Sequence, residues 1–268
     1  MEIEKINSKD GMVYWIERDD ALYAQRLTSG QYQRANWNFA QTLIQNWRNC
    51  IDVGTNNACN AIHYAKRFET VYCFEPTPST QDLWERTIKS NSIDNCVLYR
   101  DAVGNEKTQS EIYLHPKNGG HNHLDHTRFN ERAKGSDVRE KVTVNVNTID
   151  SYSFSNIDWM KIDCEGYELF VLQGAENLLR KDKPIVQIEM VRSQCRKFNY
   201  YPETVIDYMN SLGYRACSKK YGWIDTLVSN PQGIFYNGEK REKDMDVFFC
   251  HRSLNIALEP KFELFEAG

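Results

Sequence analysis

The sequence predicts a large α/β domain, because strand-like apolar runs alternate along the chain with helix-like ones. The clearest unit covers residues 49–68, where a short apolar run reaches Gly54 and an apolar stripe of helical spacing follows. A second strand-like run covers residues 70–75, and further runs cover residues 96–99 and 157–163. A strand, a tight turn and a helix in that order form the unit from which α/β sheets are built.

The turn after the first strand and the acid after the second indicate a nucleotide site. Gly54 lets a ligand approach the backbone, and the helix behind it offers free N–H groups. Glu75 lies about twenty residues beyond this turn, where nucleotide folds place the acid that binds ribose hydroxyls. Glu75 could instead be a solvated strand end, but the two signals together favour a nucleoside-containing cofactor. Asp52, an acid at the end of a buried strand, needs a partner and could orient the loop or hold a cationic ligand group.

Composition argues against several classes of protein. The chain has 268 residues and a formal net charge of −4, so no basic surplus suggests nucleic acid as the main partner. Its eight cysteines are scattered without a Cys-x-x-Cys pair, which indicates reduced thiols in a cytoplasmic protein rather than a disulfide frame or a zinc site. The charged N-terminus has no apolar signal core, and no apolar run approaches membrane-spanning length.

The length suits one large domain with an extension on each side. We expect residues 1–48 to form a strand and helix extension packed on the core, residues 49–253 to form the cofactor-binding domain, and residues 254–268 to form a tail. The helix predicted over residues 32–47 could pack on the edge of the sheet, cap the site or form the surface of a homodimer. Packing on the sheet is the favoured interpretation.

Charged side chains gather where the predicted strands end. Lys161, Asp163 and Glu165 come at the end of the fourth strand, and Glu189 ends the fifth. Open α/β sheets bind ligands at this edge, and charges there are costly unless they are paired or used. The group is therefore either a ligand site or a structural network of a lysine with carboxylates. Asp101, just past the third strand, could bond an adenine amino group or be an ordinary loop residue.

Three histidines lie close together in a polar loop, at positions 121, 123 and 126. Three imidazoles invite a metal interpretation, but no cysteine or acid pair completes a ligand set at standard spacing. We expect instead a mobile loop over the site, with one histidine facing the substrate. Alternating residues at 110–116 and 140–149 predict a strand on each side of this loop.

Several motifs occur in a fixed order between residues 49 and 190. They are Ile51-Asp52-Val53-Gly54-Thr55-Asn56, Phe74-Glu75-Pro76-Thr77-Pro78, Asp101-Ala102-Val103-Gly104, Thr148-Ile149-Asp150, Met160-Lys161-Ile162-Asp163-Cys164-Glu165-Gly166-Tyr167-Glu168, Val171-Leu172-Gln173-Gly174-Ala175 and the run from Pro184 to Glu189. In this order they resemble the FkbM family of S-adenosylmethionine-dependent methyltransferases. Two positions depart from the family pattern: Ala58 stands in place of a second glycine, and Thr55 replaces the usual alanine.

The resemblance implies a class I methyltransferase fold, with a seven-stranded, mostly parallel sheet between helices and a last strand that runs antiparallel. It implies S-adenosylmethionine as the methyl donor and S-adenosylhomocysteine as the product. Members mostly methylate hydroxyl oxygens of sugars, polyketides or related metabolites, so we expect a carbohydrate or another polar metabolite as the acceptor.

The resemblance also assigns cofactor contacts by position. Asp52, Gly54 and Asn56 would line the methionine part, Glu75 would bind the ribose hydroxyls, Asp101 would bind the adenine, and Asp163 would lie near the sulfonium and the acceptor. The complete set of cofactor-binding candidates is Asp52, Gly54, Thr55, Asn56, Asn57, Glu75, Pro76, Asp101, Ala102 and Asp163.

The catalytic candidates follow from the chemistry of methyl transfer to oxygen. A hydroxyl is a poor nucleophile, so a base or a metal ion must help. A histidine with a near-neutral pKa suits this role, and His121 is the first candidate and His123 the second. Asp163 and Glu189 are the carboxylate alternatives, with Lys161 beside them. These carboxylates could also hold a divalent cation, although that version is not favoured.

Three rival functions stay open at this point. An amino-directed nucleic-acid methyltransferase would carry an Asn/Asp-Pro-Pro-aromatic motif after the fourth strand, where this chain has Asp163-Cys164-Glu165-Gly166. A nicotinamide dehydrogenase would favour glycine at Asn56. A non-catalytic protein that keeps the cofactor pocket is poorly excluded by sequence alone.

Overall fold

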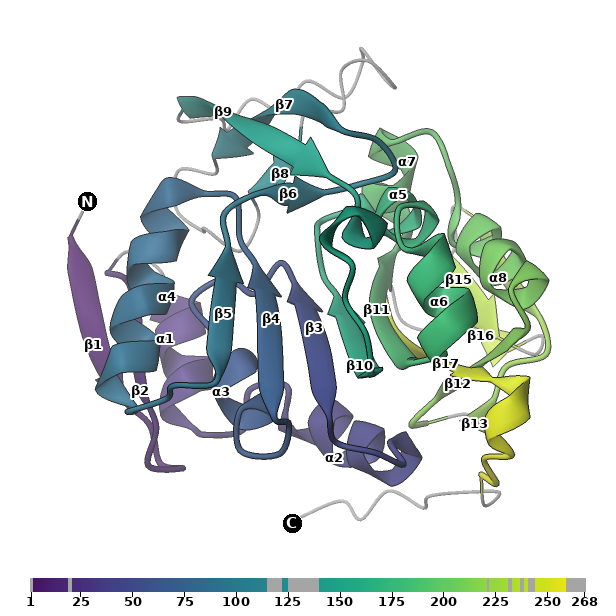
Figure 1. Ribbon diagram of the computed structural model, residues 1–268, viewed down its shortest axis with the longest axis horizontal. Helices are drawn as coiled ribbons and strands as arrows, with labels where there is room; N and C mark the ends of the chain where they lie inside the picture. The colour runs from purple at the N-terminus through teal and green to yellow at the C-terminus, as the bar shows by residue number, and fades with distance from the viewer. Residues whose placement is uncertain are drawn as a thin grey trace.

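The largest element of the fold is a sheet of eight strands that runs through the middle of the protein (Figure 1). The computed structural model describes residues 2–18, 21–114, 122–124, 140–220, 222–230, 233–236, 239–240 and 244–258. In spatial order the strands are β13 (Gly222–Trp223), β12 (Tyr214–Ser218), β17 (Asp244–His251), β11 (Ile185–Val191), β10 (Ile157–Ile162), β3 (Asn49–Val53), β4 (Thr70–Phe74) and β5 (Cys96–Tyr99).

The directions of these strands confirm the expected class I methyltransferase fold. β5, β4, β3, β10 and β11 pair in parallel, whereas β17 runs antiparallel to both β11 and β12. The two-residue β13 at the edge adds an eighth strand to the seven that the sequence predicted. The chain order reverses between β3 and β10, and in open α/β sheets such a switch point opens the crevice that binds ligands.

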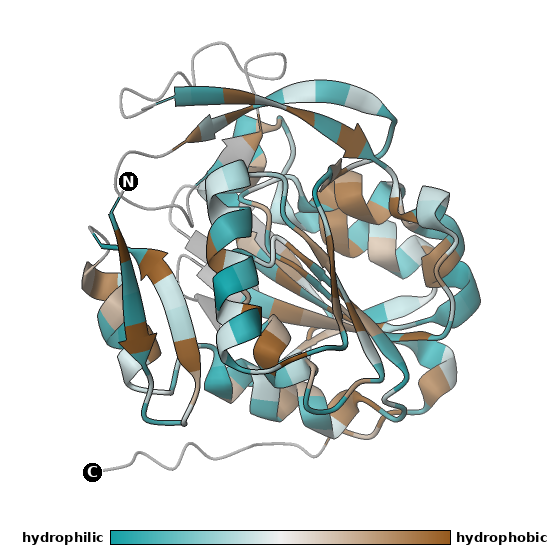
Figure 2. Cartoon of the chain, turned by 60° about the vertical axis from the view of Figure 1, so that its left-hand side comes forward, coloured by the Kyte–Doolittle hydropathy of each residue, from teal (hydrophilic) through white to brown (hydrophobic). Residues whose placement is uncertain are grey.

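Helices cover both faces of this sheet, because its central strands are buried on both sides (Figures 1 and 2). Alternation sends Ile51 and Val53 to one face and Cys50 to the other. The first face packs against α5 (Glu168–Gln173), α6 (Glu176–Asp182), α7 (Arg192–Lys197) and α8 (Pro202–Ser211). The second face packs against α1 (Ala21–Thr28), α2 (Arg34–Leu43), α3 (Ala61–Tyr64) and α4 (Pro78–Ser90).

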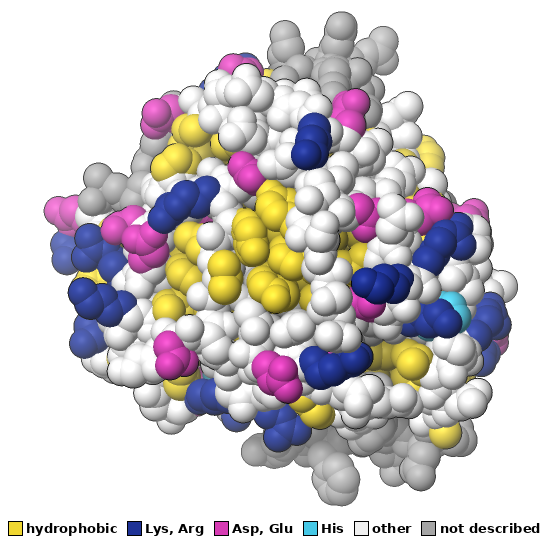
Figure 3. Space-filling view, viewed as in Figure 1, with side chains coloured by type: hydrophobic (Ala, Val, Ile, Leu, Met, Phe, Trp, Pro, Cys, Tyr) yellow, Lys and Arg dark blue, Asp and Glu magenta, His cyan; other side chains and the backbone are white. Residues whose placement is uncertain are grey.

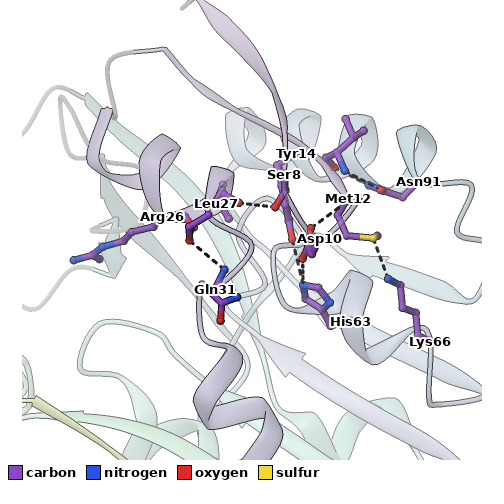
Figure 4. A network of polar contacts seen from close by, with 12 residues as sticks. Ser8, Asp10, Met12, Tyr14, Arg26, Leu27, Gln31, His63, Lys66 and Asn91 are labelled. Atoms are coloured by element: carbon purple, nitrogen blue, oxygen red, sulfur yellow. Dashed lines mark hydrogen bonds and ion pairs between the residues drawn. The ribbon is translucent and has the colours of Figure 1, made fainter. Parts of the chain in front are cut away.

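The N-terminal residues form an antiparallel hairpin of β1 (Ile3–Asn7) and β2 (Val13–Glu17) beside α4. A polar network joins the hairpin to α3 and the residues after it (Figure 4). In this network the Tyr14 hydroxyl lies 3.2 Å from His63 Nε2, and Asp10 Oδ2 lies 3.6 Å from the same nitrogen. Burial lowers the pKa of His63 to about 4, so the imidazole is neutral at pH 7 and its contact with Asp10 is not an ion pair.

The predicted helix over residues 32–47 is shorter in the structure, where α2 ends at Leu43. Its buried side chains include Trp37, Phe39 and Ala40, and the helix contacts β11 and β17 in the middle of the sheet rather than at its edge. An edge-to-face contact of 4.9 Å between Phe39 and Phe248 joins the helix to β17.

A second sheet lies across the carboxyl ends of the parallel strands (Figure 1). Its order is β6 (Ala102–Val103), β9 (Glu140–Asn147), β7 (Thr108–Leu114) and β8 (His123–Leu124). The two strands predicted on either side of the histidine-rich loop are therefore present, but they pair with each other outside the large sheet. A third sheet contains β14 (Leu227–Asn230), β15 (Gly233–Tyr236) and β16 (Glu239–Lys240). The described residues also include the 3₁₀ helices η3 (Ile149–Tyr152) and η4 (Arg252–Leu254).

Hydrophobic side chains gather at the centre of one surface of the molecule (Figure 3). On the first face of the sheet, Tyr72 and Tyr99 are partly exposed, and Val97 is 42% exposed. Tyr152 and Phe154, from the segment after β9, pack against these tyrosines, and Phe154 stacks on Tyr72 at 4.4 Å. No helix among the described residues is long and apolar enough to cross a membrane.

The turn after β3 leaves no room for a side chain at Gly54. Its φ is +74°, and a Cβ atom there would lie 1.9 Å from the backbone oxygen of Asp163, at the end of the neighbouring strand β10. Gly11 has a similar φ of +83°, but a Cβ atom there would meet nothing within 4 Å. Alanine substitutions at the two glycines therefore distinguish the cost of a side chain at positive φ from the cost of a steric clash.

We expect Gly54→Ala to lower the free energy of unfolding by at least about 3 kcal/mol, because strand β10 must move. Gly11→Ala should cost only the backbone term of about 1–2 kcal/mol. Urea unfolding of the two variants and the parent measures both values. Equal losses in the two variants would contradict the close packing of β3 against β10.

Candidate active site

The loop after β3 is organised by backbone hydrogen bonds to the end of β4. The N–H groups of Gly54 and Thr55 both donate to the Phe74 oxygen, at 3.0 and 3.2 Å. Asn56 has a positive φ of 52° and donates its N–H to Glu75 Oε2 at 3.2 Å. The loop therefore wraps around the first residues after β4.

Backbone N–H groups donate hydrogen bonds to both carboxylate oxygens of Glu75 and hold the side chain in place. Oε1 accepts the N–H of Thr77 at 2.9 Å, and Oε2 accepts that of Asn56. The side chain is buried, and burial raises its pKa to about 7 in spite of these hydrogen bonds. Each carboxylate oxygen keeps a further lone pair for a donor on a ligand.

Asp101 follows β5 and is oriented by two side chains. Its Oδ2 atom accepts the Tyr152 hydroxyl at 2.7 Å and the Asn147 amide at 2.8 Å. Oδ1 receives no hydrogen bond from the described residues and stays available to a ligand donor. The second sheet and η3 thus position the acid that the sequence placed near the adenine.

Glu75, Asp101 and Asp163 line one cleft at the carboxyl ends of β4, β5 and β10. Among the other predicted cofactor residues, Gly54, Asn56, Pro76 and Ala102 line it too. The remaining lining residues are Val53, Phe74, Thr77, Val103, Ile112, Asn122, Leu124, Cys164, Glu165 and Tyr167.

Sequence reasoning missed the apolar wall of this cleft. Ile112 of β7 and Leu124 of β8 are both buried, and they face the cleft from the second sheet. The alternating pattern around Ile112 could have identified one inward-facing residue. Nothing in the sequence pairs it with Leu124, which lies in the histidine-rich segment.

Three of the predicted cofactor residues lie outside the cleft lining. Asp52 and Thr55 are buried behind it, and Asn57 binds the N-terminal segment. The Asn57 side chain accepts the Tyr23 hydroxyl at 2.7 Å and donates to the Trp15 oxygen at 3.0 Å. Asn57 therefore joins the cofactor loop to the hairpin and α1.

Asp52 is fully buried, and neither of its carboxylate oxygens has a hydrogen-bond partner. Burial raises its pKa to about 6, although the Lys161 ammonium acts in the opposite direction. The Thr55 hydroxyl lies close enough to lower this pKa too, but it forms no hydrogen bond of ordinary geometry with the carboxylate.

A lysine and several acids share the carboxyl edge. Lys161 Nζ forms an ion pair with Asp163 Oδ2 at 2.7 Å, and the lysine side chain is only 3% exposed. Burial alone would lower the pKa of Lys161, but Asp163 and Asp52 outweigh it and hold that pKa well above its usual range. Glu189 lies opposite Asp246 in the β11–β17 register. Asp163, burial and Asp246 together raise the pKa of Glu189 to about 9.

The loop after β10 is fixed by carboxylates of its own. Glu168 Oε1 accepts the N–H groups of Cys164 and Gly166, at 3.2 and 3.0 Å, and its Oε2 accepts the Tyr200 hydroxyl at 3.1 Å. Glu165 has a positive φ of 57° and accepts a hydrogen bond from Gln194. Burial and the nearby acids raise the pKa of Glu165 to about 8.

The structure describes little of the candidate histidines. His121 and His126 lie outside the described residues, and of His123 the structure describes only the backbone, in β8. In the described part of the chain, no group of three or more His, Cys, Asp or Glu residues is placed to hold a metal ion. The roles of His121 and His123 stay predictions.

We expect stability to fall as the pH rises from 6 to 9. In the folded protein Asp52, Glu75, Glu165 and Glu189 have pKa values of about 6, 7, 8 and 9, all above their ordinary range. The folded state thus binds these protons more tightly than the unfolded state, so their stabilising effect is lost as the pH rises through those values.

The expected loss of unfolding free energy is on the order of a few kcal/mol, and urea unfolding at pH 6 and pH 9 measures it. Glu189→Gln should reduce the difference between the two pH values, because an amide does not titrate. A parent protein that is equally stable or more stable at pH 9 would refute the raised pKa values.

Comparison with known proteins gives several solved structures of low identity. The FkbM methyltransferase of Methylobacillus flagellatus KT aligns with 13% identity and a TM-score of 0.43, over 87% of this chain and 55% of that chain. The present chain thus spans about half the length of that protein.

Two other structures align over more than two thirds of their own length. The precorrin 8W decarboxylase of Methanobacterium thermoautotrophicum aligns with 10% identity and a TM-score of 0.45, over 81% of this chain and 89% of that chain. TrmK of M. capricolum, solved with S-adenosylhomocysteine, aligns with 12% identity and a TM-score of 0.38, over 82% and 68%. No curated protein matches the sequence.

The family model gives the stronger result. The methyltransferase FkbM domain matches residues 52–216, which include the cofactor loop, Glu75, Asp101 and Asp163. This match covers well over half of the chain, and it agrees with the motifs and with the order of strands. The chain therefore belongs to the FkbM methyltransferase family.

Proposed function

We propose that this methyltransferase uses S-adenosylmethionine to methylate a hydroxyl group of a carbohydrate or a related polar metabolite. The observation that carries the proposal is the cleft in which Glu75, Asp101 and Asp163 lie at the ends of three strands of one sheet. The three acids come from distant parts of the sequence, and each is placed by contacts of its own.

The residues present fit the chemical groups of this cofactor. Glu75 would accept the two ribose hydroxyls, and Asp101 would accept the adenine amino group. Ile112 and Leu124 offer an apolar wall for the adenine ring. When bound, S-adenosylmethionine supplies an electrophilic methyl group on a sulfonium cation.

The charges at the carboxyl edge also suit a cationic ligand. Asp52, Asp163 and Glu189 lie around the single ammonium of Lys161, and two of the three acids have raised pKa values. Buried acids without enough positive charge bind protons instead. A bound cation would lower those pKa values and release the protons.

For activation of the acceptor hydroxyl, His121 is the first candidate and His123 the second, and the acids at this edge are the alternatives. Asp163 lines the cleft and has Lys161 as its partner, which supports a role for its carboxylate beside the methyl group. Asp163, burial and Asp246 raise the pKa of Glu189, which suits a group that takes up a proton.

Substitution of Glu75 tests cofactor binding. Glu75→Gln should weaken the binding of S-adenosylhomocysteine at least about tenfold, because a charged acceptor of two ribose hydroxyls is lost. Isothermal titration calorimetry measures the dissociation constant. Glu69→Gln is the matched control, since Glu69 is exposed and precedes β4 whereas Glu75 follows it. Unchanged affinity in Glu75→Gln, or binding of NAD by the parent protein, would refute the assignment.

Substitution of His121 tests the identity of the base. His121→Ala should lower turnover by a factor of about 10²–10⁴ and leave the affinity for S-adenosylhomocysteine unchanged, if the histidine takes the acceptor proton. Asp163→Asn should lower both turnover and affinity, because Asp163 lines the cofactor cleft. Transfer of a labelled methyl group to a panel of glycans measures turnover.

Two results would change this assignment. Full turnover in His121→Ala would leave the role of base to His123, Asp163 or Glu189. Loss of activity with a chelator, followed by recovery with magnesium or manganese, would show that the carboxylates act as metal ligands.

A further inference from the structure

A row of polar side chains crosses the second face of the large sheet at its carboxyl edge. In the strand register, Asp52 lies opposite Lys161, Lys161 lies opposite Gln187, and Glu189 lies opposite Asp246. Residues paired in this way point to the same face of a sheet. Elsewhere on this face the core is apolar, so the polar row is confined to the end where the cofactor cleft lies.

The N-terminal segment contributes to the row through α2. The Asn36 side chain donates a hydrogen bond to Asp246 Oδ2, and the Gln187 side chain donates one to Asp246 Oδ1 at 2.5 Å. Each oxygen of the Asp246 carboxylate therefore accepts one amide N–H. This arrangement fixes the orientation of Asp246 beside Glu189.

Tyr32, just before α2, packs against the core of the same face of the sheet, close to the cofactor loop. Its ring packs edge-on against Tyr23 at 5.3 Å, and the Tyr23 hydroxyl donates a hydrogen bond to Asn57 of that loop. Burial raises the pKa of the Tyr32 hydroxyl, and Cys59, Asp163 and Glu189 raise it further. The contact with Tyr23 thus places the phenol beside the loop that follows β3, on the side of the sheet that α2 covers.

Two acids in this region lack donors. Asp52 is fully buried and has no hydrogen bond on either oxygen. Within the part of the chain that the structure describes, no residue donates a hydrogen bond to the Glu189 carboxylate. The row contains one ammonium, that of Lys161, against Asp52, Glu189 and Asp246. With one ammonium for three carboxyl groups, burial and neighbouring acids raise the pKa of Asp52, Glu189 and Asp246. A carboxyl group keeps an acceptor oxygen when it is protonated, so the row has an excess of acceptors and is complementary to a ligand that brings donors.

We propose that the polar row and Tyr32 bind the methyl acceptor, and that the acceptor is an uncharged polyol. Its hydroxyls would donate to Glu189 and Asp246, and Tyr32 would hold the hydroxyl next to the one that reacts. This assignment rests on the proposed function, because Asp163 connects the row to the cofactor cleft.

The charge of the row decides the class of acceptor. A carboxylate or phosphate beside Glu189 and Asp246 would add negative charge to a group of acids that already outnumbers its one ammonium, which is unfavourable at a partly buried site. An amine would compete with the cationic cofactor for the same acids. A neutral hydroxyl-bearing ring meets neither difficulty.

Tyr32, Asn36 and Asp246 all lie outside residues 52–216, the part of the chain that matches the family model. The residues that would choose the acceptor are thus supplied by the two flanks. The cofactor residues lie within the match.

Saturation-transfer NMR tests the class of acceptor with protein loaded with sinefungin, an unreactive analogue of S-adenosylmethionine that carries a cationic amine in place of the sulfonium. The probes are the methyl glycosides of glucose, galactose, mannose and fucose, together with methyl glucuronide and methyl glucosaminide. We expect at least one neutral glycoside to bind about tenfold more tightly than the acidic and the amino glycoside. No binding of any neutral glycoside, or equal or tighter binding of either charged glycoside, would overturn the proposal.

Variants test the place of binding with the neutral glycoside that binds best. Asn36→Ala and Tyr32→Phe should each weaken the binding of this glycoside at least about fivefold. Asn36→Ala removes the hydrogen bond that orients Asp246, and Tyr32→Phe removes the hydroxyl that would contact the sugar. Asn38→Ala is the matched control, since Asn38 lies on the same helix and is exposed. Equal affinities in Asn36→Ala and Asn38→Ala, together with an unaffected Tyr32→Phe, would place the sugar elsewhere and refute the proposal.

Calorimetry with S-adenosylhomocysteine separates this inference from the proposed function. If every variant binds S-adenosylhomocysteine like the parent and no neutral glycoside binds, the acceptor assignment is wrong and the cofactor assignment stands. If the parent does not bind S-adenosylhomocysteine, the proposed function itself is wrong. Asp246→Asn gives a further check, since it should reduce the preference for neutral over acidic glycosides.

Discussion

The buried ion pair between Lys161 and Asp163 is the interaction on which the carboxyl edge of the sheet depends. Lys161 lies in the central strand β10 with almost no exposure, so its charge must be met by protein groups. Asp163 forms the ion pair with it, and Asp52 of β3 is a second negative charge close to the ammonium. Without this ammonium the acids around it would be isolated buried charges or protonated acids, and the edge could not keep several carboxylates close together.

The same ion pair connects the cofactor cleft with the opposite face of the sheet. Asp163 lines the cleft, whereas Lys161 points to the face that α2 covers. The backbone of Asp163 also leaves Gly54 no space for a side chain, so the cofactor loop and the end of β10 must move together. A cation bound in the cleft would therefore change the charge balance of the polar row, and cofactor and acceptor are expected to affect each other's binding.

Much of this site could be predicted from the sequence, because its acids come directly after predicted strands. Glu75 and Asp101 come directly after two strands of the sheet, and parallel strands bring their carboxyl ends together whatever the loops contain. The same reasoning found Asp52 as a buried acid in need of a partner. It failed for the contact of Asn36 with Asp246, which are 210 positions apart and belong to a helix and an antiparallel strand. Ile112 and Leu124 were missed because nothing in the sequence indicates that β7 and β8 pair with each other in a separate sheet.

The division of the site between the family match and its flanks has a physical basis. Cofactor groups are the same in every reaction of this kind, so the acids that bind them can come from the ends of the central parallel strands. The acceptor differs between enzymes, and its binding groups need positions that can change without disturbing the sheet. A helix laid over one face, such as α2, and an antiparallel strand near the edge, such as β17, offer these positions. In this chain the Asn36–Asp246 hydrogen bond joins the two, so, on the proposed assignment, a change in either flank is expected to alter acceptor binding and to leave the Glu75 side intact.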